Sequence, residues 1–147
     1  MLDTARRLTR SAHKPRQTDL KRAVSTAYYA MFNFLAHECA DLFIGGGAAR
    51  KSSSWNHVHR ALEHGFAKNA CGQARVLGFP AEIVQFAERF ILMQEHRHRA
   101  DYDPSSRYER ADVIVFIDNV DRAIKDFKSS PRPDRLAFAT LVLLRKR

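Results

Sequence analysis

Apolar side chains recur at steps of three and four residues along most of this chain, the spacing that places them on one face of an α-helix. The longest such pattern begins after Thr18 and Asp19, either of which can cap the start of a helix, and it ends before Gly45. Its apolar positions form a wide stripe: Ala23, Val24, Ala27, Tyr28, Met31, Phe32, Leu35, Cys39, Leu42 and Phe43. A stripe this wide predicts a helix at the centre of the fold.

Three further patterns predict three more helices. The second helix begins near residue 55 and fades by residue 71. The third runs from Pro80, which suits the first turn of a helix, to about Tyr102. The fourth runs to Phe127 and begins at Ser106, whose spacing to Glu109 is that of a capping box.

The two ends of the chain predict shorter elements. Residues 1–17 predict a short helix or a frayed arm that stops at Pro15. Residues 134–147 predict an apolar tail helix with a basic end, which could dock on the bundle, dock on another subunit or lie on a membrane surface. Together the patterns predict one all-α domain over residues 1–147, an up-and-down four-helix bundle with its core at about residues 18–128 and short additional terminal helices.

The formal charge of +9 is divided unevenly along the chain. Residues 1–22 hold seven Lys or Arg against two carboxylates, and residues 122–147 hold eight against two. Residues 23–121 hold ten Lys or Arg against twelve carboxylates. Basic ends can attract the phosphates of RNA or DNA, or they can simply keep the termini solvated.

We expect a cytoplasmic protein without membrane attachment, because residues 1–22 do not resemble a signal peptide and no apolar run approaches the roughly 20 residues that cross a bilayer. Cys39 and Cys71 lack the spacing of a disulfide scaffold or a zinc ribbon, so we expect both to be reduced. Residues 45–47 do not open a phosphate-binding loop, and His37 lacks a second histidine four residues on. We therefore predict neither a metal nor a cofactor.

The third predicted helix carries its apolar stripe directly into charged residues. The positions that share this face are Ile83, Phe86, Ala87, Phe90, Met93, Arg97 and Asp101. Because an isolated charge is costly to bury, Arg97 must be matched by a partner. Either its guanidinium holds a ligand's carboxylate or phosphate in forked geometry, or Arg97 and Asp101 pair within the helix and close the end of the bundle.

The histidines of the second predicted helix, His57, His59 and His64, are interpreted as surface or interface groups, since the sequence supplies none of them with a fixed partner. His57 and His59 are two residues apart, as are His96 and His98. Residues at that spacing point to different faces of a helix. A two-histidine metal site within either helix is therefore not expected.

Two segments together resemble the HEPN family of small bacterial and archaeal proteins: AVSTAYYAMF at residues 23–32 and RHRADYD at residues 97–103. The resemblance covers about residues 18–128. It implies an up-and-down helical bundle that forms a homodimer. It also implies a ribonuclease, in many members the toxin that pairs with a nucleotidyltransferase antitoxin.

The family's catalytic signature is an arginine followed, after four to six intervening residues, by a histidine. Arg97 matches the arginine by position, but no histidine follows His98, and the expected place holds Tyr102, Asp103 and Pro104. Metal-free RNA cleavage needs a base to take the 2′-hydroxyl proton, and histidine performs this task near neutral pH. The departure from the signature favours binding over cleavage.

The first hypothesis is accordingly a HEPN-like module that binds RNA or a nucleotide as a homodimer. Its site is the stretch of residues 97–102, with Arg97, Arg99, Asp101 and Tyr102 as the binding residues. Arginine suits phosphate recognition, because its planar guanidinium can hold a phosphate in forked geometry.

The alternative hypothesis is an active, metal-independent endoribonuclease. In this interpretation Arg97 stabilises the developing negative charge, and His98 or His96 acts as the acid or base. A third hypothesis is a helical interaction scaffold without enzymatic activity. RNA cleavage and salt-sensitive RNA binding are the observations that separate the three.

Overall fold

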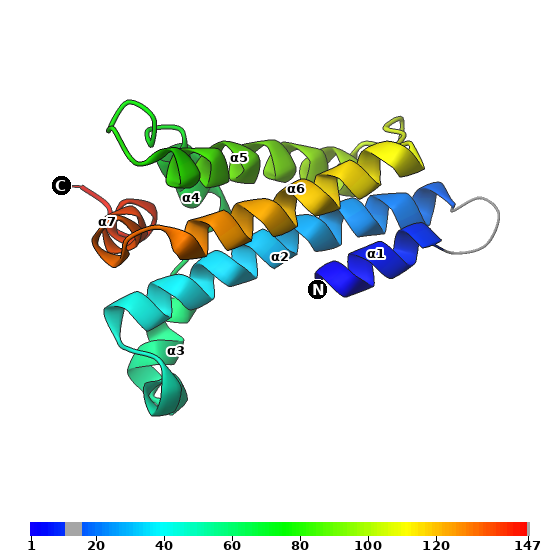
Figure 1. The fold of residues 1–147 in the computed structure, drawn as a ribbon. Helices are drawn as coiled ribbons and strands as arrows, with labels where there is room; N and C mark the ends of the chain where they lie inside the picture. The colour runs from blue at the N-terminus through cyan, green and yellow to red at the C-terminus, as the bar shows by residue number, and fades with distance from the viewer. Residues whose placement is uncertain (11–15, 147) are drawn as a thin grey trace.

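The computed structural model describes residues 1–10 and 16–146, and these residues form helices joined by turns and loops (Figure 1). The helices are α1 (Leu2–Arg10), α2 (Gln17–Phe43), α3 (Ser53–His59), α4 (His64–Cys71), α5 (Ala81–Tyr102), α6 (Arg110–Ser129) and α7 (Arg132–Leu143), with one 3-10 turn, η1 (Gly47–Lys51). The prediction of an all-α helical bundle is confirmed. The predicted stop at Pro15 and the basic last residue, Arg147, lie outside the described residues.

α2 is the central helix of the bundle. α1 and α5 pack along it in the antiparallel direction, and α6 packs along it in the parallel direction (Figure 1). α3 and α7 meet α2 near its C-terminal end (Figure 1). α1 also packs against α6, so α1 is the fourth member of the bundle. The four helices predicted from the sequence instead included the segment from residue 55 and not α1.

That segment is two short helices and not one, so the prediction of a single second helix was wrong. A turn at residues 60–63 separates α3 from α4 and brings Leu62 into the core. On α3, Trp55 donates its indole N–H to Asp41 at the end of α2, at 2.9 Å. On α4, Ala67 is buried where this helix packs against α5 and α7. The turn lets two apolar patches of one segment pack against different helices.

The break between α5 and α6 lies where the sequence placed it, but the predicted capping box is wrong. The residue before α6 is Glu109, and no side chain caps the first turn. The Ser106 hydroxyl lies within hydrogen-bond distance of the carbonyl oxygens of Arg99 and Asp103, at 3.0 and 2.8 Å. Ser106 therefore closes the C-terminal end of α5, where helical carbonyls lack partners of their own.

The tail helix α7 docks on its own bundle. Phe138 and Val142 are fully buried, and the Phe138 ring centroid lies 6.2 Å from that of Phe86 on the apolar stripe of α5. An ion pair of 3.0 Å between Arg135 and Glu38 adds a polar contact to α2. Of the three placements left open by the sequence, the structure shows docking on the chain's own bundle. Within residues 1–10 and 16–146, no helix combines the length and apolar character needed to cross a membrane.

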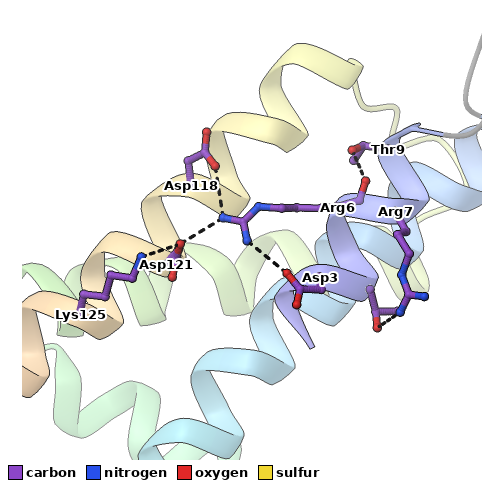
Figure 2. A network of polar contacts seen from close by, with 8 residues as sticks. Asp3, Arg6, Arg7, Thr9, Asp118, Asp121 and Lys125 are labelled. Atoms are coloured by element: carbon purple, nitrogen blue, oxygen red, sulfur yellow. Dashed lines mark hydrogen bonds and ion pairs between the residues drawn. The ribbon is translucent and has the colours of Figure 1, made fainter.

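α1 is fastened to α6 through Arg6 (Figure 2). One terminal nitrogen of its guanidinium lies 3.1 Å from a carboxylate oxygen of Asp121 and 3.5 Å from one of Asp118. The other terminal nitrogen lies 3.7 Å from Asp3 on α1 itself. With 29% of its side chain exposed, Arg6 bridges two helices at the edge of the core.

Replacing Arg6 with Gln removes the charge that joins α1 to α6. We expect the free energy of unfolding to fall by about 1 kcal/mol, because bonds to charged groups contribute roughly 1.5–3 kcal/mol and partial exposure screens them. Urea denaturation measures the loss. Arg7→Gln is the matched control, since Arg7 is exposed and bonds Thr4 within the same helix. The two variants should differ, and equal stability would contradict the role of Arg6.

Candidate functional site

Arg97 lies where the buried stripe of α5 reaches the surface, with 17% of its side chain exposed. One terminal N–H of its guanidinium donates to the hydroxyl of Tyr29 on α2, at 2.7 Å. Its Nε lies 3.0 Å from Oδ2 of Asp101, one turn further along α5. The Nε–H is not directed at this oxygen, so the contact is an ion pair without a hydrogen bond from Nε. This is the intrahelical pair that one interpretation of the sequence predicted.

Three tyrosine rings surround the guanidinium of Arg97. Its central carbon lies 5.9 Å from the ring centroid of Tyr28, 5.2 Å from that of Tyr29 and 5.7 Å from that of Tyr102. Aromatic faces attract a cation within about 6 Å. Tyr28 is fully buried and Tyr102 is 63% exposed, so the charge of Arg97 is held between an inner and an outer ring.

His64, the first residue of α4, brings a third helix into this cluster. Its Nδ1 lies 2.6 Å from the Tyr28 hydroxyl, and its ring stacks on Phe32 with centroids 3.9 Å apart. Burial, with a further effect from the positive charge of Arg97, lowers the pKa of His64. Grouping His64 with surface histidines was therefore wrong. No local pattern could have identified this place, because the partners of His64 on α2, Tyr28 and Phe32, are more than thirty residues away.

His96 and Arg99 lie on a different side of α5 from Arg97. Nδ1 of His96 is 3.2 Å from the Tyr108 hydroxyl and 3.1 Å from a guanidinium nitrogen of Arg99. The His96 ring packs against Phe116 of α6, with centroids 4.5 Å apart. Burial and the nearby Arg99 charge lower the pKa of His96. The structure therefore does not bring these two predicted site residues together with Arg97.

His98 and Tyr102 form the exposed part of the site. Their ring centroids are 4.9 Å apart, and Tyr102 covers the Arg97 guanidinium from outside. Asp101 accepts a hydrogen bond of 3.4 Å from Ser25, which ties the end of α5 to α2. Of the predicted residues, the structure thus groups Arg97, His98, Asp101 and Tyr102.

Cations and carboxylates are mixed in the segments that meet at this end of α5. Lys21 donates to the backbone carbonyl of Asp103, at 3.4 Å, which places the start of α2 beside the end of α5. The neighbouring segments of α2, α5, the connecting loop and α6 contribute the cations Lys21, Arg22, Arg99, Arg107 and Arg110, and the carboxylates Asp19, Asp103, Glu109 and Asp112. The surface offers positive groups to a ligand without being uniformly basic.

Comparison of the chain with protein-family models, curated proteins and solved structures found no match. The resemblance to the HEPN family stays a prediction based on two sequence segments. In the fold these segments are in contact, through the hydrogen bond between Arg97 and Tyr29. Among the residues that the structure describes, no group of three or more His, Cys, Asp or Glu side chains is arranged to hold a metal ion.

The half-buried histidines make stability depend on pH. The pKa values of His64 and His96 are lowered in the folded state, so the unfolded chain takes up protons more readily as the pH falls below about 6.5. Their contribution to stability is complete above that pH and is lost as the pH falls through the folded-state pKa values. We expect acidification to lower the free energy of unfolding, measured in urea. Each histidine contributes at most about 1.4 kcal/mol for each pH unit.

His64→Asn removes one of these titrating groups and keeps a hydrogen-bonding side chain. We expect this variant to show a weaker decrease in stability on acidification than the wild-type protein. His57→Asn is the control, because His57 is exposed on α3. The same pH dependence in both variants would rule out His64 as a source of the effect.

Proposed function

We propose that this chain is a HEPN-like protein that binds RNA or a nucleotide at the end of α5, around residues 97–102. The observation that carries the proposal is the exposed ring of Tyr102, which has the His98 ring at 4.9 Å and the Arg97 guanidinium carbon 5.7 Å from its centroid. Exposed aromatic side chains bind unstacked bases, and every base offers a face for stacking.

Arg97 supports this surface and does not act as a free phosphate clamp. Its guanidinium donates one hydrogen bond to Tyr29 and forms an ion pair with Asp101, so part of its binding capacity is already used within the chain. It holds Tyr102 in place and adds positive potential behind a stacked base. Arg99 lies on another side of α5 from Arg97 but only three residues before Tyr102, so it supplies contacts to phosphate beside the ring, together with exposed cations of the neighbouring segments.

The assembly of the protein is a separate part of the proposal. The homodimer and the pairing with a nucleotidyltransferase antitoxin are implied by the HEPN resemblance alone. Solution mass by light scattering tests the first, and copurification with a nucleotidyltransferase encoded beside this chain tests the second. Neither is needed for Tyr102 to stack on a base.

Replacing Tyr102 with Ala removes the stacking surface. We expect the binding free energy for a labelled 20-nucleotide RNA to weaken by about 1–3 kcal/mol for each base that stacks there, measured by fluorescence anisotropy. Tyr102→Trp keeps an aromatic face and should keep the affinity. Leu144→Ala is a control with a similarly exposed side chain, 59% against 63%. Wild-type affinity in Tyr102→Ala would refute this site.

Metal-independent RNA cleavage is a second candidate function, and His64 is the observation that favours it. A lowered pKa keeps its imidazole neutral at pH 7, and a neutral imidazole can accept a proton. Arg97 lies in the same cluster and could hold the developing negative charge. His96 faces α6 and has no part in this arrangement.

An RNA cleavage assay in the presence of a chelator separates the two functions. If the chain is a ribonuclease, Arg97→Ala should abolish chelator-resistant cleavage. Loss in His64→Ala with retention in His98→Ala would identify His64 as the acid or base, and the reverse result would identify His98. Circular dichroism of each variant checks that the fold is kept. Absence of cleavage together with salt-sensitive binding leaves the binding function alone.

A further inference from the structure

A basic projection, which we define as residues 47–61, extends from the bundle beyond the C-terminal end of α2 (Figure 1). It consists of η1, α3 and the residues beside them. The sequence from Leu42 to Leu62 contains no aspartate or glutamate, whereas residues 23–121 as a whole hold more carboxylates than Lys and Arg. The projection is therefore a local excess of positive charge on an otherwise slightly acidic middle region.

The exposed side chains of the basic projection are hydrogen-bond donors. Lys51 and Arg60 are exposed, and within the described residues neither takes part in an ion pair. A hollow of about 490 Å³ is lined by Ser53, Asn56, His57, Arg60 and Ala61. Hydroxyl, amide, imidazole and guanidinium groups can all donate to phosphate oxygens, and no carboxylate lines the hollow to repel them.

Asp41 fixes the basic projection to α2. Its carboxylate accepts two hydrogen bonds from Arg50, at 3.0 and 2.7 Å, and one from the indole of Trp55, at 2.9 Å. Trp55 is buried, and the Ser52 hydroxyl caps α3 by accepting from the backbone N–H of Trp55 at 3.1 Å. Arg50 is used internally, so Lys51 and Arg60 are the cations that this arrangement holds out toward solvent.

We propose that the basic projection binds the phosphate backbone of the RNA whose base stacks on Tyr102. This proposal rests on the function proposed above. From Tyr29, beside Arg97, to the end of α2 at Phe43 is about 21 Å along the helix axis, at 1.5 Å per residue. A mononucleotide cannot reach both places, whereas a strand of 20 nucleotides can. The added affinity is electrostatic and independent of base sequence.

The test is the salt dependence of binding to a labelled 20-nucleotide polyuridine RNA, for the wild-type protein and for Lys51→Ala/Arg60→Ala. Each phosphate contact to a single strand contributes about 0.7 to the steepness of the slope of log affinity against log salt. The slope measured for the double variant should therefore be less steep by about 1.4. Its affinity deficit should therefore shrink about sevenfold between 50 and 200 mM salt.

Arg122→Ala/Lys146→Ala is the matched control, because it removes the same charge from exposed positions on α6 and after α7. The control should keep the wild-type slope, and a labelled mononucleotide should bind both double variants as it binds the wild-type protein. Equal slopes for wild type and Lys51→Ala/Arg60→Ala would overturn the proposal, as would equal flattening in the control.

Two further results separate this proposal from the function on which it rests. Suppose that Tyr102→Ala binds RNA with wild-type affinity while Lys51→Ala/Arg60→Ala shows a less steep salt dependence. The stacking site is then refuted and the contact with the RNA backbone is supported. If the wild-type protein binds no RNA, both proposals fail, and an acidic protein becomes the partner that the charge of the projection fits.

Discussion

α2 must bury apolar side chains on several sides at once, and this constraint arranges the rest of the molecule. Five of its twelve buried residues are alanines, which allow neighbouring helices to approach closely. One partner cannot cover such a surface, so α1, α5 and α6 pack along it and α3 and α7 close its C-terminal end. Isolated helices are marginally stable in water, so each helix of the bundle depends on packing against its neighbours.

The same helix carries the residues that organise both functional regions. Its first half contacts Arg97 through Tyr28 and Tyr29, and contacts Asp101 through Ser25. Asp41 in its last turn holds the basic projection. A regular helix has a fixed rise per residue, so the spacing between the two regions is set by the length of chain between them. Loop rearrangement elsewhere in the protein leaves that spacing unchanged.

Sequence patterns predicted the features that depend on local spacing. The buried stripe of α5 and the pairing of Arg97 with Asp101 both follow from residues three or four apart on one helix. The position of His64 does not follow from such local spacing, because its partner Tyr28 lies 36 positions away in the sequence. The same holds for α1, whose bond from Arg6 to Asp121 joins residues 115 positions apart.

The failed capping box has a different cause, a competition between two local partners. The spacing of Ser106 and Glu109 fits the start of α6, but the carbonyl of Arg99 at the end of α5 lies 3.0 Å from the same hydroxyl. A short loop brings the end of one helix close to the start of the next, and one side chain can serve either. The HEPN resemblance predicts the function of the site, and local spacing alone does not.

Trp55 is the one tryptophan in the sequence, and it is buried between His37 and His59, with ring centroids 5.2 and 5.0 Å away. Tryptophan fluorescence therefore reports on the junction of the basic projection with α2 and not on the phenylalanine-rich core. The unlabelled protein contains its own optical reporter. Detachment of α3 would change tryptophan fluorescence with little loss of helical circular dichroism, whereas melting of the bundle would change both signals.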